Sequence, residues 1–296
     1  MPIALPSPQV LEITGADAIA FAHAQFASDV SALASRQWQW SAWLSAQGRV
    51  RAFFRIVRVD DERLLLILQG GQAEALRTAL APFVFRAKVQ MRAAGSWHAI
   101  GFDRLADVLD CLGAVPGTTD AVVAGDRVGV AVPGPQPRWF VLGETQPPEV
   151  VEASPAAWNR WNAADVAAGI VQISDDQADR FLPSWLGLEE LGAVSVRKGC
   201  YPGQEIVARL HFKGGNKRWL QQLAFRADAI PEPGTALEID HDAGAGGELL
   251  RAAWTEPGQG LALATLPKIP AGAVLSAPAM PGATFRVVST IGNPSD

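Results

Sequence analysis

A cysteine in a basic, glycine-rich stretch is the residue of this chain best suited to chemistry. The stretch spans residues 197–218 and reads RKGCYPGQEIVARLHFKGGNKR, with six of the 25 basic residues and four of the 28 glycines. Cys200 follows Arg197 and Lys198 in it. Because positive charge and free backbone N–H groups favour the thiolate over the thiol, Cys200 is a candidate for a reactive or ligand-donating sulfur. The alternative, a small apolar cysteine of the core, fits this cationic setting less well.

The local pattern around Cys200 predicts a loop, a short helix and a second basic glycine loop. Pro202 suits the first helical position, where its missing N–H costs nothing. Glu205 then falls in the first turn, where the helix dipole favours a carboxylate. A short apolar stripe follows, which would pack the helix on a core: Ile206, Val207 and Leu210. We therefore expect Cys200 just ahead of a helix N-terminus.

The run K-G-C-Y-P-G-Q-E, followed by V-A-R and by G-x-x-K-R, resembles the signature of the YgfZ family. Members of that family are folate-binding relatives of the glycine-cleavage aminomethyltransferase. They are implicated in making or repairing iron–sulfur clusters, and so in tRNA modification by cluster enzymes. Weaker matches extend over most of the chain: I-T-G-A-D at 13–17, Q-x-x-S-D-V at 25–30, G-R-V at 48–50, K-V at 88–89, W at 161 with A-G-I at 168–170, and F-L-P at 181–183.

The resemblance implies an α+β fold in which two interleaved α+β domains surround a folate site and a C-terminal antiparallel β-barrel follows. It also implies tetrahydrofolate, or a folate derivative, as the cofactor. The functional group would be the thiol of Cys200, kept anionic by Lys198 and the helix N-terminus. Gln204 and Glu205 would hold the loop by hydrogen bonds.

Six residues are candidates for holding the folate: Trp161, Glu189, Tyr201, Arg209, Lys217 and Arg218. A folate has a flat pterin, an aryl linker and an anionic tail, so its site needs a stacking face, hydrogen-bonding groups and cations. Trp161 matches the family tryptophan near folate, although a plain core position fits it equally. Glu189 lies where the aminomethyltransferases use an acid on the pterin, or else on a solvated helix face. Lys217 and Arg218 would hold the folate tail or an RNA phosphate, or would cap the loop into the barrel.

One acid that the resemblance leads us to expect is missing. The aminomethyltransferases place an aspartate after their Gly-Gly turn, next to the folate amine, where this chain has Ala52 and Phe53. Without that carboxylate, amine transfer lacks its proton-handling group, so the fold would be inherited without the reaction. Whether the chain is an enzyme is left open. Four arginines on the same strands would steer an anion or, as we favour, protect an edge strand by their charge: Arg49, Arg51, Arg55 and Arg58.

Strand and helix patterns divide the chain into three parts, 1–95, 96–218 and 219–296. In the first two, hairpin-like pairs of strands alternate with helices, which favours α+β units over a parallel sheet. We expect strands at 10–14, 38–44, 50–59, 64–68, 87–92, 97–102, 127–132 and 138–142. We expect helices at 18–33, 70–80, 103–112 and 155–168. In the third part, short strands split by Pro/Gly turns indicate a small antiparallel barrel, at 220–225, 236–239, 248–254, 261–266 and 285–289.

Composition narrows the class of protein. The formal net charge of −5 gives no overall nucleic-acid footprint, so no stable nucleic-acid complex is expected. The longest apolar run, at 64–68, is too short to cross a membrane, and no Lys or Arg precedes Arg36, which argues against a signal peptide. Two cysteines make no disulfide framework and suit a reducing cytoplasm. Because a structural metal usually takes about four ligands and the histidines do not cluster with the cysteines, no resident metal is expected.

Three functions stay open at this point. We favour a cytoplasmic folate-binding protein that supports iron–sulfur enzymes or assembly proteins, without a membrane partner. The first alternative is a folate-dependent one-carbon transferase acting on a small amine, with another carboxylate such as Glu189 in place of the missing aspartate. The second is a tRNA-binding adaptor that uses Lys213, Lys217 and Arg218 on phosphates.

Overall fold

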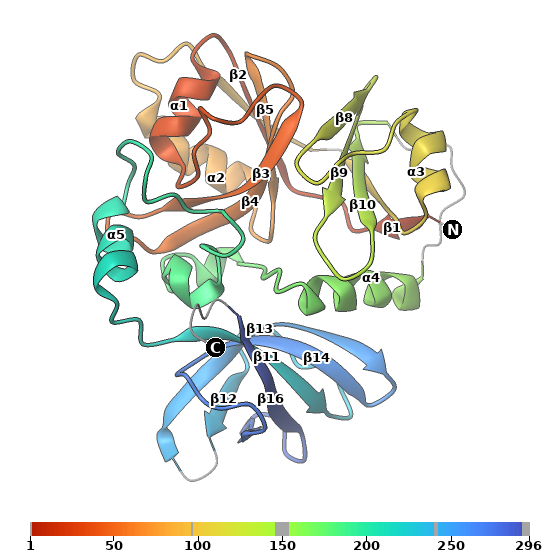
Figure 1. The fold of residues 1–296 in the computed structure, drawn as a ribbon, viewed down its shortest axis with the longest axis vertical. Helices are drawn as coiled ribbons and strands as arrows, with labels where there is room; N and C mark the ends of the chain where they lie inside the picture. The colour runs from red at the N-terminus through yellow and green to blue at the C-terminus, as the bar shows by residue number, and fades with distance from the viewer. Residues whose placement is uncertain (1, 96, 146–153, 240–241, 292–296) are drawn as a thin grey trace.

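The structure, a computed structural model, describes residues 2–95, 97–145, 154–239 and 242–291. Within these residues the strands form two five-stranded sheets and a closed six-stranded barrel. The two sheets lie beside each other at one end of the molecule and the barrel lies at the other end (Figure 1).

The first sheet has the strand order β3-β4-β5-β2-β6. Its strands are β2 (Val10–Thr14), β3 (Gln37–Leu44), β4 (Val50–Arg58), β5 (Arg63–Leu68) and β6 (Gln90–Ala94). The helices of this part are α1 (Ala18–Gln25), α2 (Ala73–Leu80) and a 3-10 turn (Ala81–Phe83). Successive side chains of a strand point to opposite faces. Phe54 and Leu66 therefore pack with α1 and α2, while Phe53 and Leu65 join a different core on the other face.

The second sheet has the order β1-β7-β10-β9-β8. Its strands are β1 (Ile3–Leu5), β7 (His98–Phe102), β8 (Ala121–Ala124), β9 (Arg127–Val132) and β10 (Arg138–Gly143). Helix α3 (Leu105–Leu112) packs on one face of this sheet through Val108 and Leu112. Because β1 pairs with β7 while β2 belongs to the first sheet, the start of the chain crosses from one sheet to the other.

The barrel has the order β11-β14-β13-β12-β15-β16 and closes on itself, which leaves no free sheet edge. Its strands are β11 (Trp219–Arg226), β12 (Ala236–Ile239), β13 (Asp242–Glu256), β14 (Gln259–Leu266), β15 (Val274–Ser276) and β16 (Thr284–Ile291). Leu223, Phe225 and Phe285 are among the side chains of its own core.

The segment between the second sheet and the barrel holds the three parts together. Helix α4 (Pro155–Ala167) begins at Ser154, whose hydroxyl accepts a hydrogen bond from the Ala157 N–H. Two α4 asparagines bind β13: the amide nitrogens of Asn159 and Asn162 donate to the carbonyls of Trp254 and Ala252 at 2.7 and 2.8 Å. Two 3-10 helices (Asp175–Gln177 and Pro183–Leu186) and α5 (Gln204–Lys213) follow.

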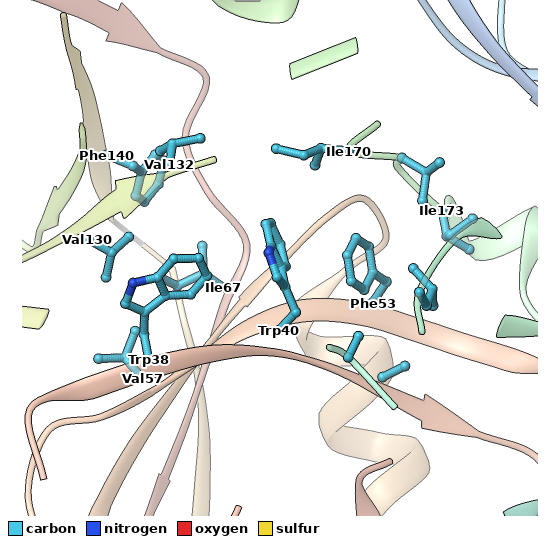
Figure 2. Close-up of a cluster of buried hydrophobic side chains, with 14 of the residues drawn as sticks. Trp38, Trp40, Phe53, Val57, Ile67, Val130, Val132, Phe140, Ile170 and Ile173 are labelled. Carbon is cyan, nitrogen blue, oxygen red and sulfur yellow. The ribbon is translucent and has the colours of Figure 1, made fainter. Parts of the chain in front are cut away.

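One hydrophobic core lies between the two sheets and reaches the barrel. Trp38, Trp40 and Phe53 of the first sheet face Val130 and Phe140 of the second (Figure 2). Trp40 stacks on Phe53 with ring centroids 5.0 Å apart. Barrel side chains belong to the same core, namely Leu220, Leu250, Ala253 and Leu263. The parts are therefore fixed to one another by continuous packing.

Two predictions about the elements are wrong. The helix expected at 18–33 ends at Gln25, because Phe26 is extended (φ −99°, ψ 155°) and pairs with Trp43, which draws the chain onto β3. The strand carrying Arg49 to Arg58 is not an edge strand, since β4 pairs with β3 on one side and β5 on the other. The arginines of this strand therefore do not protect a sheet edge, as was predicted.

Smaller differences concern short or shifted elements. The strand expected at 87–92 runs from Gln90 to Ala94, and the helix expected at 70–80 begins at Ala73. The short strands β1, β8 and β15 were not predicted. The other predicted elements lie within a few residues of the observed ones, except that β13 is much longer than the strand expected at 248–254.

Candidate functional site

A cavity lies where the two sheets, α4 and the barrel meet. Its volume is about 290 Å³, and its aromatic wall comes from Phe140, Trp158 and Trp161. Residues 6–9, between β1 and β2, also line it, as do Gly70 and Gly71. Three buried charged residues from separate parts of the chain complete the lining: Arg55, Asp165 and Arg251. Flat apolar walls with a few polar groups are the usual make-up of a small-molecule site.

A second hollow, of about 450 Å³, adjoins the first because both are lined by Leu68, Gly70 and Gly71. Glycine is required at position 70, where φ is +85° and a Cβ atom would lie 2.5 Å from the Ile173 carbonyl oxygen. Ala52 also lines this second hollow, whereas Phe53 is buried in the core between the sheets. The position at which a carboxylate was expected therefore carries a methyl group.

Four charged residues, which we call the charge cluster, lie buried beside the first cavity: Arg55, Arg138, Asp165 and Arg251. Each is at most 5% exposed. Asp165 binds two of the arginines, with Oδ1 2.9 Å from Nη1 of Arg138 and Oδ2 2.9 Å from Nη2 of Arg251. Arg138 comes from β10, Arg251 from β13 and Asp165 from α4, so this carboxylate links the second sheet, the barrel and the helix between them.

Arg55 is the member of the charge cluster without a hydrogen-bonding partner. Its guanidinium lies over the rings of Trp40 and Phe140, 4.4 and 5.4 Å from their centroids. Its Nε is buried without an acceptor, and no hydrogen bond or ion pair joins this side chain to any residue that the structure describes. The pKa of Arg55 is lowered to about 10, mainly by burial and also by Arg138 and Arg251, while Asp165 opposes the shift. The side chain is thus still a cation at neutral pH.

Of the six residues predicted to hold a folate, only Trp161 lines the first cavity. Its ring packs on Gly101, where a Cβ atom would lie 2.5 Å from the ring, and Arg138 lies over it at 4.7 Å. Trp161 is therefore a fixed wall as well as part of the core. Trp158, one helical turn earlier, is only partly buried and lines the same cavity, so it offers the more accessible ring.

Cys200 is exposed and lies in the loop ahead of α5. The helix begins at Gln204 after Gly203 (φ +78°), so Pro202 precedes the helix and the prediction that it takes the first helical position is wrong. Gly203 packs directly on the turn between β3 and β4, where a Cβ atom would lie 2.4 Å from the Ser45 carbonyl oxygen. No residue of 197–218 lines either hollow. The thiol and the cavity are thus two separate features.

The residues predicted to support Cys200 brace its loop. The Lys198 ammonium is buried and donates to three backbone carbonyls at the end of α1, those of His23, Phe26 (2.5 Å) and Ser28 (3.2 Å). A cation at this end of a helix also suits the helix dipole. Burial lowers the pKa of Lys198 to about 8. The side-chain amide of Gln204 donates to the Lys198 carbonyl at 3.1 Å, while Glu205 is exposed.

The remaining predicted residues are dispersed. Tyr201 is buried in the core below the Lys198 ammonium, and burial raises the pKa of its phenol. Glu189 lies 3.0 Å from Nδ1 of His211, and Arg209 is exposed. Arg218 donates to the Gly246 carbonyl at 2.9 Å, which joins the second glycine loop to the barrel, and Lys217 is exposed.

No group of three or more His, Cys, Asp or Glu residues able to hold a metal ion occurs within the described residues, and His241 lies outside them. None of the described helices has the length and apolar character needed to cross a membrane. The candidate features are the aromatic cavity and, apart from it, the exposed thiol of Cys200.

Sequence reasoning missed the charge cluster because its members are far apart in the chain and come from four different elements. One signal could have identified Arg55. In the run F-F-R-I-V, at 53–57, Phe53, Arg55 and Val57 share one face of the strand. Because Phe53 and Val57 are both fully buried, an arginine between them is a buried charge.

No family model matches this chain. Among solved structures, the chain is similar to the glycine cleavage system aminomethyltransferase T from Bartonella henselae, with a TM-score of 0.73 and 15% sequence identity. The similarity covers 97% of this chain and 84% of that one. The predicted fold class is thereby confirmed: α+β sheets with a C-terminal closed antiparallel barrel, in the arrangement of an aminomethyltransferase T.

Proposed function

We propose that this chain binds tetrahydrofolate, or a related reduced folate, in the two adjoining hollows and thereby supports iron–sulfur enzymes. The observation that carries the proposal is the aromatic cavity between the sheets, which combines Trp158 and Phe140 with the unpaired cation of Arg55. The structural similarity to an aminomethyltransferase of the glycine cleavage system supports the same ligand class. The proposed role is assembly or repair of clusters, including those of tRNA-modifying enzymes, with Cys200 as the functional thiol.

The residues present fit a folate. A flat pterin and aryl group match the rings of Trp158 and Phe140, and the anionic tail matches a buried arginine. The two hollows, of about 290 and 450 Å³, share Gly70 and Gly71 in their linings, so a ligand that occupied both would pass these two glycines. When bound, a folate would supply a one-carbon carrier.

The proposal is folate binding rather than amine transfer. Ala52 lines the second hollow and carries no group that could accept a proton. Two aspartates also line it. Oδ1 of Asp175 accepts a hydrogen bond from a backbone N–H at 3.2 Å, and both carboxylate oxygens of Asp179 accept hydrogen bonds from Nε of Arg51, at 3.1 and 3.0 Å. Glu189, the substitute acid considered from the sequence, pairs with His211 and lines neither hollow.

An exposed thiol in a braced loop supports the proposed role of Cys200 with client enzymes or assembly proteins. The loop is fixed by Lys198 and Gln204 on one side and by Gly203 on the other, so the sulfur is presented on a rigid support. Cys111 and Cys200 are not joined in a disulfide, which is in keeping with the proposed cytoplasmic location.

The variant Trp158→Ala tests whether the cavity binds tetrahydrofolate. We expect about tenfold weaker binding of tetrahydrofolate, because a stacking face is lost from the cavity wall. Isothermal titration calorimetry on the full chain measures the change. Trp185→Ala is the matched control, since Trp185 is also partly buried but lines neither hollow. Equal affinity in the two variants, or no binding of tetrahydrofolate by the unaltered protein, contradicts the proposal.

The variant Cys200→Ala tests the proposed functional role of the thiol. In a strain that lacks the protein, this variant should fail to restore the activity of an iron–sulfur tRNA-modifying enzyme, because the accessible sulfur is gone. Cys111→Ala should restore it, since Cys111 is half-buried on α3. Full rescue by Cys200→Ala would show that the thiol has no functional role.

A further inference from the structure

The charge cluster beside the first cavity is not neutral. Three buried guanidinium groups face the carboxylate of Asp165, so two positive charges lack a counter-charge among the residues that the structure describes. Burying a charge without a partner is costly unless another group compensates it. A bound anion would supply the negative charge that the cluster lacks.

Within the cluster, Arg55 is the group left free to bind that anion. Asp165, Asn162 and the Ile170 carbonyl engage Arg251, and Asp165 with two carbonyls engages Arg138. Arg55 has no such partner, lines the cavity and is held in place by the rings of Trp40 and Phe140. Its planar fork is thus already oriented, which reduces the entropy lost when it binds a planar, two-oxygen acceptor.

The walls identify the kind of molecule that carries the anion. Phe140, Trp158 and Trp161 give flat apolar surfaces beside Arg55, and the cavity of about 290 Å³ is larger than an inorganic ion needs. We infer that Arg55 binds the carboxylate of an aromatic ligand in this cavity. For one source of that carboxylate, the tail of a folate, the inference rests on the proposed function. For the other source, a separate aromatic acid, it does not.

Binding of 4-aminobenzoyl-glutamate and of its neutral diamide, by calorimetry on the full chain, tests the inference. The dicarboxylate should bind the unaltered protein about 10- to 100-fold more tightly than the diamide, because a charge-assisted hydrogen bond to a buried arginine is lost in the latter. Arg55→Met should abolish that preference, and Arg55→Lys should keep only part of it since lysine lacks the fork. Arg197→Met, at an exposed position, should leave the preference unchanged.

The stability of the Arg55→Met variant shows whether Arg55 binds a ligand or only supports the structure. Arg55→Met removes one of two uncompensated buried charges and keeps an apolar side chain between the rings, so its urea midpoint should equal or exceed that of the unaltered protein. A stable Arg55→Met variant that retains the preference for the dicarboxylate overturns the inference. So does equal affinity of the unaltered protein for the dicarboxylate and the diamide.

The two sources of the carboxylate differ in their outcomes. If a folate tail supplies the carboxylate, Arg55→Met weakens the binding of tetrahydrofolate. The same variant leaves the binding of 6-methyltetrahydropterin, which has no tail, unchanged. If a separate aromatic acid supplies the carboxylate, Arg55→Met weakens the binding of 4-aminobenzoate and leaves the binding of tetrahydrofolate unchanged. Arginine-dependent binding of 4-aminobenzoate without any binding of tetrahydrofolate would support the inference while rejecting the proposed function.

Discussion

Asp165→Asn should lower the free energy of unfolding by about 3–5 kcal/mol, the range expected when one partner of a buried ion pair is removed. Asparagine has nearly the same shape as aspartate, so the change removes charge and little volume. The three arginines of the charge cluster would then be buried with no carboxylate among the described residues to face them. Urea unfolding at neutral pH, followed by circular dichroism, measures the effect.

The size of this effect follows from what Asp165 joins. Its two oxygens hold Arg138 of β10 and Arg251 of β13, each at 2.9 Å, and the carboxylate itself lies on α4. Arg251 also donates to Asn162 at 2.6 Å and to the Ile170 carbonyl at 2.9 Å, so its position depends on several groups of the same segment. Loss of the carboxylate loosens the junction of the second sheet with the barrel.

Asp179→Asn provides the matched control, because it makes the same chemical change in an exposed ion pair. Asp179 binds Nε of Arg51 at 3.0 Å, but both side chains are more than a third exposed. Exposed pairs contribute about 0–1 kcal/mol. If the two variants were equally stable, the charge cluster would not be the electrostatic junction described above.

The sequence predicted the fold well where local pattern and tertiary structure agree. The strands β2, β3, β4 and β5 were predicted nearly to the residue, since each shows a run or an alternation of apolar residues bounded by turn residues. The helix predicted to reach residue 33 was too long, because alanines and Phe26 continue a helical pattern that pairing with Trp43 overrides. Strands of three or four residues, such as β1 and β15, are held by their neighbours and leave too little pattern to detect.

The site was less predictable than the fold. The exposed loop around Cys200 was visible because its residues are contiguous, but none of the residues assigned to a folate from the same stretch lines either hollow. The cavity is instead built from residues near positions 55, 70, 140, 160 and 250, which only the packing of three parts brings together. Trp161 is the one folate candidate that lines the first cavity, and its prediction rested on its helix and on a spacing that matched a known pattern.

Gly203→Ala should destabilise the protein by about 3 kcal/mol and displace the loop that carries Cys200. Gly203 has φ +78°, a conformation that costs a residue with a Cβ about 1–2 kcal/mol. The added methyl group would also lie 2.4 Å from the Ser45 carbonyl oxygen and 2.6 Å from the Cα of Gly48. Both contacts are with backbone, which relieves a clash only by moving the turn between β3 and β4. Urea unfolding measures the stability, and labelling of Cys200 with a thiol reagent reports on the loop.

Gly192→Ala separates the two contributions, because Gly192 has a similar φ of +71° but nothing within 4 Å of the position of its Cβ. It should cost about 1–2 kcal/mol from backbone strain alone. The excess for Gly203→Ala then measures the contact between the loop and the β3–β4 turn. Because no residue of 197–218 lines either hollow, Gly203→Ala should leave ligand binding in the cavity unchanged while altering the reactivity of Cys200. Equal costs for the two glycines would mean that the turn yields freely and does not fix the thiol.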